Sequence, residues 1–273
     1  MINPLPEYKD LDLSGEVVQA ATRMEARARE TVSEEMFRQL VAPLLAQGVK
    51  TVLEFGCGTA ALSRRIAQAA PWATVYASDK SQGMLKAAGQ MVDEEKIDNL
   101  HLQVWDVLDE SVFPFSAAKF DLIISSVVIP YFDDAKTVAL IARLSARLTS
   151  GGVLAFVEQD WNTDTLNIPK FELFRDIMAK DQRSFKRTLA LGLRPYLREV
   201  GLKLLPRRSF LWTDDAYGDY TRDLLERFAD SACDKGQIKP EERDEWKKTL
   251  GDLAGAGDFF YGIVYHLVAG RHE

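Results

Sequence analysis

The sequence has few of the features on which disulfide-rich, nucleic-acid-binding or membrane-spanning proteins depend. Among 273 residues there are two cysteines, Cys57 and Cys233, which cannot form a disulfide framework and fit a reducing compartment. The net charge of −7 argues against a general nucleic-acid binder, because such a protein needs a basic surface to neutralise phosphates. No apolar stretch approaches the length of a membrane span, so no membrane insertion is expected.

Signals for export and for metal binding are also missing. The first residues carry neither a basic segment nor an apolar one, so no secretory signal is expected. The three histidines, His101, His266 and His272, form no closely spaced pair with each other or with cysteine, and we expect no metal site. A hydrophobic content of 47% and a charged content of 27% are typical of a globular enzyme. We therefore predict a cytoplasmic protein.

Strand-like and helix-like segments alternate through the first part of the chain. Apolar runs predict strands at residues 50–55, 74–78, 101–105, 120–127 and 153–158. Helices are predicted at residues 59–69, 82–92 and 134–148. Strands that alternate with helices in this way form right-handed βαβ units, whose parallel sheet is covered on both faces.

The two ends of the chain follow a different pattern. Residues 1–15 indicate a loop and residues 16–47 a helical segment, broken near Ser33 or Pro43. Beyond residue 160 the sequence predicts helices at 169–187, 195–200, about 214–233 and 240–253, and strands at 202–210 and 259–269. We expect these two strands to form an antiparallel pair that completes the sheet, with the helices between them as a cap.

The predicted fold class is α/β, a Rossmann-like, seven-stranded, mostly parallel sheet with an antiparallel C-terminal strand and a helical cap. A single domain is expected to span residues 1–273. Its predicted parts are an N-terminal helical lid at 1–48, a cofactor-binding core at 49–160, and the cap with the terminal strand pair at 161–273.

One short motif carries most of the functional information. The segment Val52-Leu-Glu-Phe-Gly-Cys-Gly-Thr-Ala-Ala61 contains G-x-G-x-x-A at the end of a predicted strand and the start of a helix. Gly56 permits a tight turn, Gly58 lets the backbone approach a ligand, and Ala61 lets helix and strand pack closely. Free N–H groups at the helix start favour a nucleotide-like ligand.

Acidic residues accompany this motif. Asp79 follows the second predicted strand, 23 residues beyond Gly56, where a carboxylate can accept hydrogen bonds from ribose hydroxyls. Capping of the next helix is the alternative role for Asp79, and loop capping is the alternative for Asp106 after the third strand. Glu54 argues against a nicotinamide dinucleotide, because its charge would crowd a pyrophosphate but could hold an ammonium group.

Together these segments resemble the class I S-adenosylmethionine-dependent methyltransferases. Residues 52–61 resemble motif I, usually V-L-D-x-G-C-G-x-G, with Ala60 in place of the third glycine. Residues 76–79, 105–107, 120–128 and 148–154 resemble the acidic-strand motif, the adenine-side motif, motif IV and the motif before strand five. Residues 261–271 are similar to the last strand of small-molecule members related to ubiquinone and menaquinone biosynthesis methyltransferases.

The resemblance implies S-adenosylmethionine as cofactor and a role for each matching residue. Glu54 and the backbone of Gly56, Cys57 and Gly58 would hold the methionine end. Asp79 would bind the ribose, Lys80 and Met84 would flank the adenine, and Asp106 and Val107 would meet its edge. Ser126 would lie near the methionine end, and Arg23 or Arg27 of the N-terminal helix could reach the cofactor carboxylate.

The sequence gives fewer signals for the acceptor side of the site than for the cofactor side. Tyr131, Asp160 and Trp161 follow strands four and five at their carboxyl ends, where open α/β sheets bind ligands, so we expect them to face the substrate. Turn formation is the alternative for Asp160, and simple packing is the alternative for Trp161. Pro130 stands in a stretch that often carries histidines in relatives, and no catalytic base is identified.

The predicted function is methyl transfer to an O, N or C atom of a small-molecule metabolite by in-line displacement. A small-molecule substrate is the expected partner, with a homodimer as a candidate assembly. Two alternatives remain open at this point. One is a protein of the same fold that binds the cofactor without methyl transfer, as a cyclase or regulator, and the other is an NAD(P)-dependent oxidoreductase.

Overall fold

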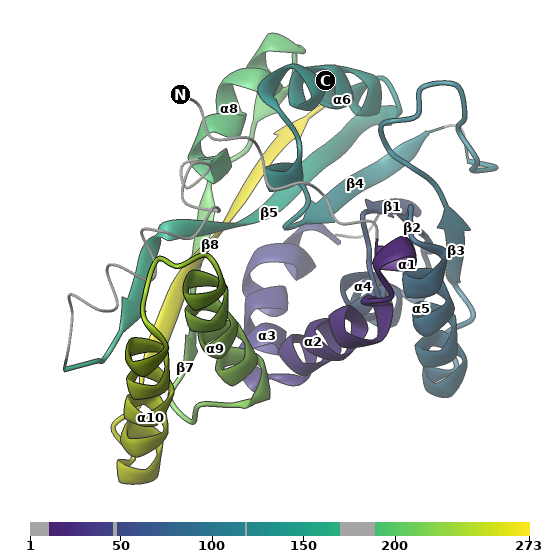
Figure 1. Ribbon diagram of the computed structural model, residues 1–273. Helices are drawn as coiled ribbons and strands as arrows, with labels where there is room; N and C mark the ends of the chain where they lie inside the picture. The colour runs from purple at the N-terminus through teal and green to yellow at the C-terminus, as the bar shows by residue number, and fades with distance from the viewer. Residues whose placement is uncertain (1–10, 46–47, 118, 170–188) are drawn as a thin grey trace.

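A computed structural model describes residues 11–45, 48–117, 119–169 and 189–273, and eight strands within these residues form one sheet (Figure 1). The strand order is β3-β2-β1-β4-β5-β8-β6, and β7 also pairs with β8. The strands are β1 Thr51–Phe55, β2 Thr74–Asp79, β3 Leu100–Val104, β4 Phe120–Ser126, β5 Leu148–Leu166, β6 Lys203–Leu204, β7 Arg208–Asp214 and β8 Tyr261–Arg271.

The direction of the strands confirms the predicted Rossmann-like architecture. Strands β3, β2, β1, β4 and β5 are parallel to one another, whereas β8 runs antiparallel to β5, β6 and β7. Strands β2 and β3 lie on one side of β1, whereas β4 and β5 lie on the other side. The strand order therefore reverses beside β1, and ligands of open α/β sheets bind in the crevice at the carboxyl ends of strands at such a point.

Helices cover both faces of the sheet, as Figure 1 shows. On one face lie α2 Val17–Arg29, α3 Thr31–Met36, α4 Ala61–Ala69, α5 Gln82–Glu95 and α9 Asp219–Asp234. On the other face lie α6 Asp134–Ser145 and α8 Leu189–Glu199. Side chains along each strand alternate between two apolar cores, one on each face of the sheet. In one core Val52 and Ile124 pack under α4, and in the other Leu53 and Ile123 pack under α6. The last long helix, α10 Pro240–Ala256, packs on α9.

The N-terminal segment is helical, as predicted, and of its two expected breaks the one near Pro43 is present, whereas the other lies at Glu30 rather than at Ser33. The extended residue Glu30 separates α2 from α3, and a π-helical turn (Phe37–Val41) and a short 3-10 turn (Ala42–Leu44) follow. The prediction of a loop for residues 1–15 was wrong at Leu11–Ser14, which forms the short helix α1. Asp12 of that helix accepts hydrogen bonds from the Ser81 hydroxyl and two backbone N–H groups of α5, a distant contact that no local pattern indicates.

The C-terminal part has one strand more than predicted. The expected strand at 202–210 is divided into β6 and β7, with Pro206 between them, because proline has no N–H for a strand ladder. Strand β5 continues to Leu166 through an irregularity after Asp160. The helix predicted at 169–187 lies almost entirely outside the described residues, and the division into lid, core and cap stays a prediction.

Within the described ranges, no helix combines the length and the apolar character that crossing a bilayer requires.

Candidate functional site

The loop after β1 is the centre of the candidate site, and its backbone explains its glycines. Gly56 and Gly58 adopt positive φ angles of 65° and 56°. A Cβ on Gly56 would lie 2.5 Å from a methyl of Val128, and one on Gly58 would lie 2.5 Å from the sulfur of Met24. Side chains are therefore excluded at both positions. Ala60, at φ 56°, also adopts the left-handed conformation before α4, which accounts for the glycine common there in the resembling family.

Asp79 at the end of β2 fixes this loop. Its Oδ2 accepts a hydrogen bond from the Gly58 N–H (2.9 Å), and its Oδ1 accepts one from the Ser81 N–H (3.0 Å). Burial raises the pKa of the Asp79 carboxyl, against the effect of these hydrogen bonds. The buried side chain of Met84 reaches toward Gly58 from α5, and Lys80 lies exposed beside Asp79. Asp79 and Met84 are thus brought together around the glycine loop.

Glu54 places a carboxylate in the floor of the same site. Its side chain is 2% exposed, and the Ser63 hydroxyl of α4 donates a hydrogen bond to its Oε2. Burial raises the pKa of Glu54 to about 7, although the Ser63 hydrogen bond and the positive charge of Arg27 act in the opposite direction. A bound cation would favour the ionised form of this carboxyl.

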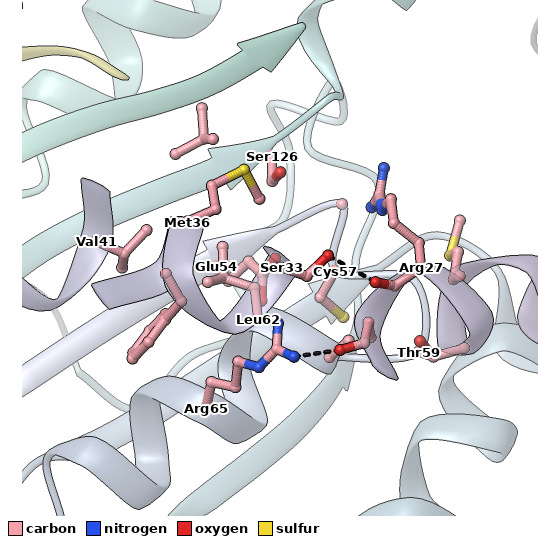
Figure 2. A pocket seen from close by; sticks show the side chains of 16 residues that line it. Arg27, Ser33, Met36, Val41, Glu54, Cys57, Thr59, Leu62, Arg65 and Ser126 are labelled. Carbon is pink, nitrogen blue, oxygen red and sulfur yellow. Dashed lines mark hydrogen bonds between the residues drawn. The ribbon is translucent and has the colours of Figure 1, made fainter. Parts of the chain in front are cut away.

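A cavity lies between the glycine loop and the N-terminal helices (Figure 2). The predicted site residues that line it are Glu54, Gly56, Cys57 and Ser126. Its other walls are residues of α2, α3, the π-helical turn, the loop before α4, α4 and β5: Met24, Arg27, Ala28, Ser33, Met36, Phe37, Val41, Thr59, Ala61, Leu62, Arg65 and Val157. The cavity is thus bounded by polar groups at the loop, and on the helices by apolar groups together with the polar side chains of Arg27, Ser33 and Arg65.

Three consecutive residues of α4 connect the site to the N-terminal helices. Ser63 holds Glu54, and the guanidinium of Arg64 binds both carboxylate oxygens of Glu25 in α2 at 2.6 and 2.7 Å. Arg64 also pairs with Glu95 of α5, and Arg65 donates to the backbone carbonyl of Ala28 in α2. Sequence reasoning missed these contacts, because they join segments about 40 residues apart with no shared motif.

The structure turns Arg23 away from the cavity and places Arg27 in its wall. The Arg23 guanidinium lies 4.0 Å from Asp223 of α9, so this predicted cofactor residue faces the cap. Arg27, one helical turn later, lines the cavity directly. Of the two arginines that the resemblance suggested, Arg27 is the one that lines the cavity.

The adenine-side residues lie after β3, beside the end of β2. The Trp105 N–H donates to the carbonyl of Asp79 (3.0 Å), which brings the next residue, Asp106, to the same edge of the sheet. Asp106 is exposed and accepts a hydrogen bond from the Leu108 N–H (2.9 Å), the local capping role considered as its alternative. The Val107 side chain is buried in the core under α6.

The three substrate-facing predictions differ in their placement. Tyr131 is 44% exposed on the 3-10 turn Ile129–Tyr131, outside the cavity wall. Trp161 packs edge-on against Phe228 of α9, in the core on the cavity side of the sheet. Asp160 is buried and binds Asn162 and His266. The structure does not bring these three residues together, and the alternative roles of packing and turn formation describe Trp161 and Asp160.

The segment after β4 is strained and is held by a second buried carboxyl. Val127 has a φ of 58°, which is unusual for a β-branched residue and is typical of functional or ligand-bearing loops. Glu158 of β5 accepts weak hydrogen bonds (3.4 Å) from the next two backbone N–H groups, and burial raises its pKa to about 8. No cluster of three or more metal-ligating side chains occurs in the described parts of the chain.

Comparisons with known proteins give a consistent result. Residues 52–152 match a family described as a methyltransferase domain. Trans-aconitate 2-methyltransferase of Deinococcus radiodurans is 33% identical over 118 residues, which are 43% of this chain and 41% of that enzyme. Malonyl-[acyl-carrier protein] O-methyltransferase of Priestia megaterium is 28% identical over 131 residues, 48% of this chain and 44% of that enzyme. The chain thus spans less than half the length of these curated relatives.

Similarity to solved structures extends over the whole chain. The crystal structure of the [4+2]-cyclase SpnF superposes with a TM-score of 0.56, and the match covers 98% of each chain. The sequence identity of 16% means that this match shows the fold alone.

Proposed function

We propose that this chain, in which residues 52–152 form a class I methyltransferase domain, transfers the methyl group of S-adenosylmethionine to a small molecule. The observation that carries the proposal is the convergence of Glu54, the Gly56–Gly58 loop and Asp79 at the point where the strand order reverses. The curated relatives described above are methyltransferases, so neither cofactor binding without transfer nor a dinucleotide oxidoreductase is favoured.

The residues present fit the cofactor. Glu54 supplies a buried carboxylate for the ammonium of the methionine end, and Asp79 supplies acceptor oxygens for the ribose hydroxyls. Gly58 gives the loop the positive φ that brings its N–H to Asp79, and we expect Met84 on the side of the adenine. When bound, S-adenosylmethionine supplies a methyl group on a positively charged sulfur.

The chain contributes positioning and exclusion of water. Ser126 at the end of β4 and Val157 of β5 face the cavity from the sheet, while Met24, Met36 and Phe37 cover it from the helices. Displacement at a sulfonium disperses charge in the transition state, so an apolar enclosure that holds the reactants in line favours it. A cavity that the N-terminal helices cover in this way suits a small acceptor rather than a macromolecule.

Binding and transfer test the proposal directly. Calorimetric titration should show binding of S-adenosylhomocysteine and no binding of NADH. Incubation with methyl-labelled S-adenosylmethionine and fractions of small metabolites should transfer label to a compound of low mass. Failure to bind S-adenosylhomocysteine would refute the proposal, and binding without transfer to any fraction would favour the non-transferring alternative.

Two further parts of the proposal concern the state of the protein. We place it in the cytoplasm, supported by the two free cysteines, which are typical of a reducing compartment.

We also propose a homodimer as a candidate assembly, which sedimentation equilibrium tests.

The raised pKa of Glu54 predicts a pH-dependent cofactor affinity. Because the ammonium of the cofactor needs an ionised partner, the affinity for S-adenosylhomocysteine should fall as the pH drops below about 7. The expected slope approaches a tenfold loss per pH unit between about pH 7 and pH 5.5, where the ligand ammonium stays protonated. Calorimetry across this range measures it.

The Glu54→Gln variant is the control for this pH dependence. Glutamine keeps the shape of the side chain and can still accept the Ser63 hydrogen bond, but it does not titrate. Its affinity should be lower at pH 7.5 and flat with pH. An equally steep pH dependence in the variant would assign the titration to another group.

A further inference from the structure

Arg27 differs from the other arginines around the cavity in its partners. The guanidinium groups of Arg23, Arg64 and Arg65 each lie within 4.0 Å of a carboxylate, on Asp223, Glu25 and Glu34 respectively. Among the described residues, no ion pair joins Arg27 to a carboxylate. The Arg27 charge lowers the pKa of Glu54 from a distance, but the hydrogen bond of that carboxylate comes from Ser63.

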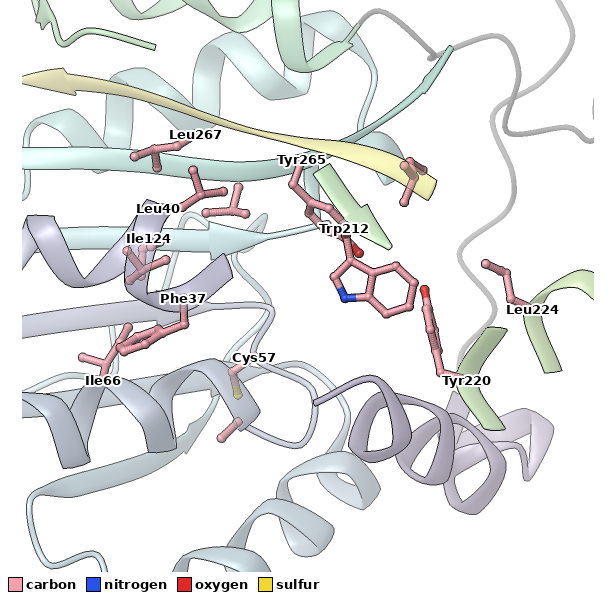
Figure 3. Packing of buried hydrophobic residues seen from close by; sticks show 14 of the residues in the cluster. Phe37, Leu40, Cys57, Ile66, Ile124, Trp212, Tyr220, Leu224, Tyr265 and Leu267 are labelled. Atoms are coloured by element: carbon pink, nitrogen blue, oxygen red, sulfur yellow. The ribbon is translucent and has the colours of Figure 1, made fainter. Parts of the chain in front are cut away.

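Neutral hydroxyls orient Arg27 instead. The carbon of its guanidinium lies 5.9 Å from the centre of the Tyr220 ring in α9, and the hydroxyls of Tyr220 and of Tyr265 in β8 interact with its charge. Tyr265 is itself fixed by Gln159 of β5, whose amide donates to its hydroxyl at 2.6 Å. Behind them, the ring of Trp212 packs edge-on against Tyr220 with the centroids 5.4 Å apart (Figure 3). Four side chains from α9, β5, β7 and β8 thus hold one cation rigidly at the cavity.

A cation held in this way is a receptor for an anion. Hydroxyls orient a guanidinium but do not neutralise it, and an uncompensated charge in a largely enclosed site is costly. An entering carboxylate removes this cost and forms paired, charge-assisted hydrogen bonds with the planar fork of the guanidinium. Figure 2 shows Arg27 and Arg65 on opposite sides of the cavity, and Arg65 is already engaged by Glu34 and Ala28.

We propose that Arg27 binds a carboxylate of the acceptor, so that the substrates of this site are small carboxylic acids. The inference rests on the proposed methyl transfer and names its substrate class. The residues that orient Arg27 lie on α9, β5 and β8, beyond the matched domain and toward the cap. Glu54 and the glycine loop, which are proposed to receive the cofactor, line the same cavity as Arg27, together with Ser126 and Val157.

The experiment titrates carboxylates into the chain saturated with S-adenosylhomocysteine. The probes are trans-aconitate and a panel of small di- and tricarboxylates, each compared with its methyl ester. At least one free acid should bind more tightly than its ester. Arg27→Met should weaken the binding of that free acid by about 10- to 100-fold. Arg27→Lys should weaken it less, because lysine keeps the charge but lacks the planar guanidinium that binds both carboxylate oxygens.

A matched control and two further measurements separate the outcomes. Arg29→Met removes an exposed cation from the same helix and should change carboxylate binding by less than about twofold. The affinity of Arg27→Met for S-adenosylhomocysteine should stay within about threefold of the wild type at pH 8, where Glu54 is largely ionised. Arg27→Lys serves as the test variant if Arg27→Met does not fold.

Three results would overturn the assignment. The first is that no free acid of the panel binds, and the second is that the Arg27 variants bind the acids as tightly as the wild type. The third is a large loss of S-adenosylhomocysteine affinity in Arg27→Met with unchanged affinity for 5′-methylthioadenosine, which lacks the amino-acid end. That result would assign Arg27 to the carboxylate of the cofactor. Failure of the wild type to bind S-adenosylhomocysteine would refute the proposed function instead.

Discussion

Replacement of Asp79 by asparagine should weaken S-adenosylhomocysteine binding by about 2–4 kcal/mol, roughly 30- to 1000-fold. The carboxylate accepts hydrogen bonds from the N–H groups of Gly58 and Ser81, and the proposed ribose contact adds two hydroxyl donors. Every partner is a donor, so the position needs a group that only accepts. The NH₂ group of an asparagine would face one of these N–H donors, so the hydrogen bond that holds either the glycine loop or the start of α5 would be lost. Calorimetric titration measures the loss.

Asp109→Asn is the matched control for this substitution. Asp109 accepts hydrogen bonds from the N–H and hydroxyl of Ser111, a similar local arrangement, but it is exposed, whereas Asp79 is buried and binds the glycine loop. Its variant should bind S-adenosylhomocysteine within about twofold of the wild type. Wild-type affinity in Asp79→Asn would remove Asp79 from the ribose site.

The sheet could be predicted from sequence because its strands are short apolar runs bounded by turn residues. The run that became β1 ends at Gly56, and each following strand is separated from the next by a helical segment of ordinary length. Such local signals fix the strand order through the right-handed crossover rule. The strand at 202–210 was predicted as one element because the run looked continuous, whereas Pro206 divides it.

The cofactor side of the site was predictable for the same reason. Motif residues that follow strands meet at one edge of a parallel sheet, and Glu54, Gly58 and Asp79 are brought together there. The contribution of the N-terminal helix was not predictable in detail. The choice between Arg23 and Arg27 depends on the rotation of α2 over the cavity, which is set by distant contacts such as the pair of Glu25 and Arg64.

The acceptor side shows a second limit of sequence reasoning. Asp160 and Trp161 were both expected to face the substrate because both follow the same strand. In the structure β5 continues through these residues, and neighbours in a strand point to opposite faces of the sheet. Trp161 therefore lies in the core on the cavity side, and Asp160 contacts His266 on the other face.

Removal of the Arg64 side chain charge should have the largest effect on stability. Arg64→Met would leave the Glu25 carboxylate, 7% exposed, without its cation, and breaking such a buried pair costs about 3–5 kcal/mol. Chemical denaturation should show this loss as a lower midpoint with an unchanged slope. Arg38→Met, which removes an exposed arginine paired with Glu35, should cost less than about 1 kcal/mol.

A double-mutant cycle separates the pair from the general effect of substitution. The loss of stability in Arg64→Met is expected to come from the buried Glu25 carboxylate, which is left without a cation. If so, adding Glu25→Gln should restore part of that stability, since the neutral amide needs no cation. Equal losses in Arg64→Met and Arg38→Met would contradict a structural role for the pair. An unchanged midpoint together with faster hydrogen exchange over residues 17–29 would mean that α2 opens locally. In that case Met24 and Arg27 leave the cavity with the helix, and the cost appears as a loss of ligand affinity rather than of global stability.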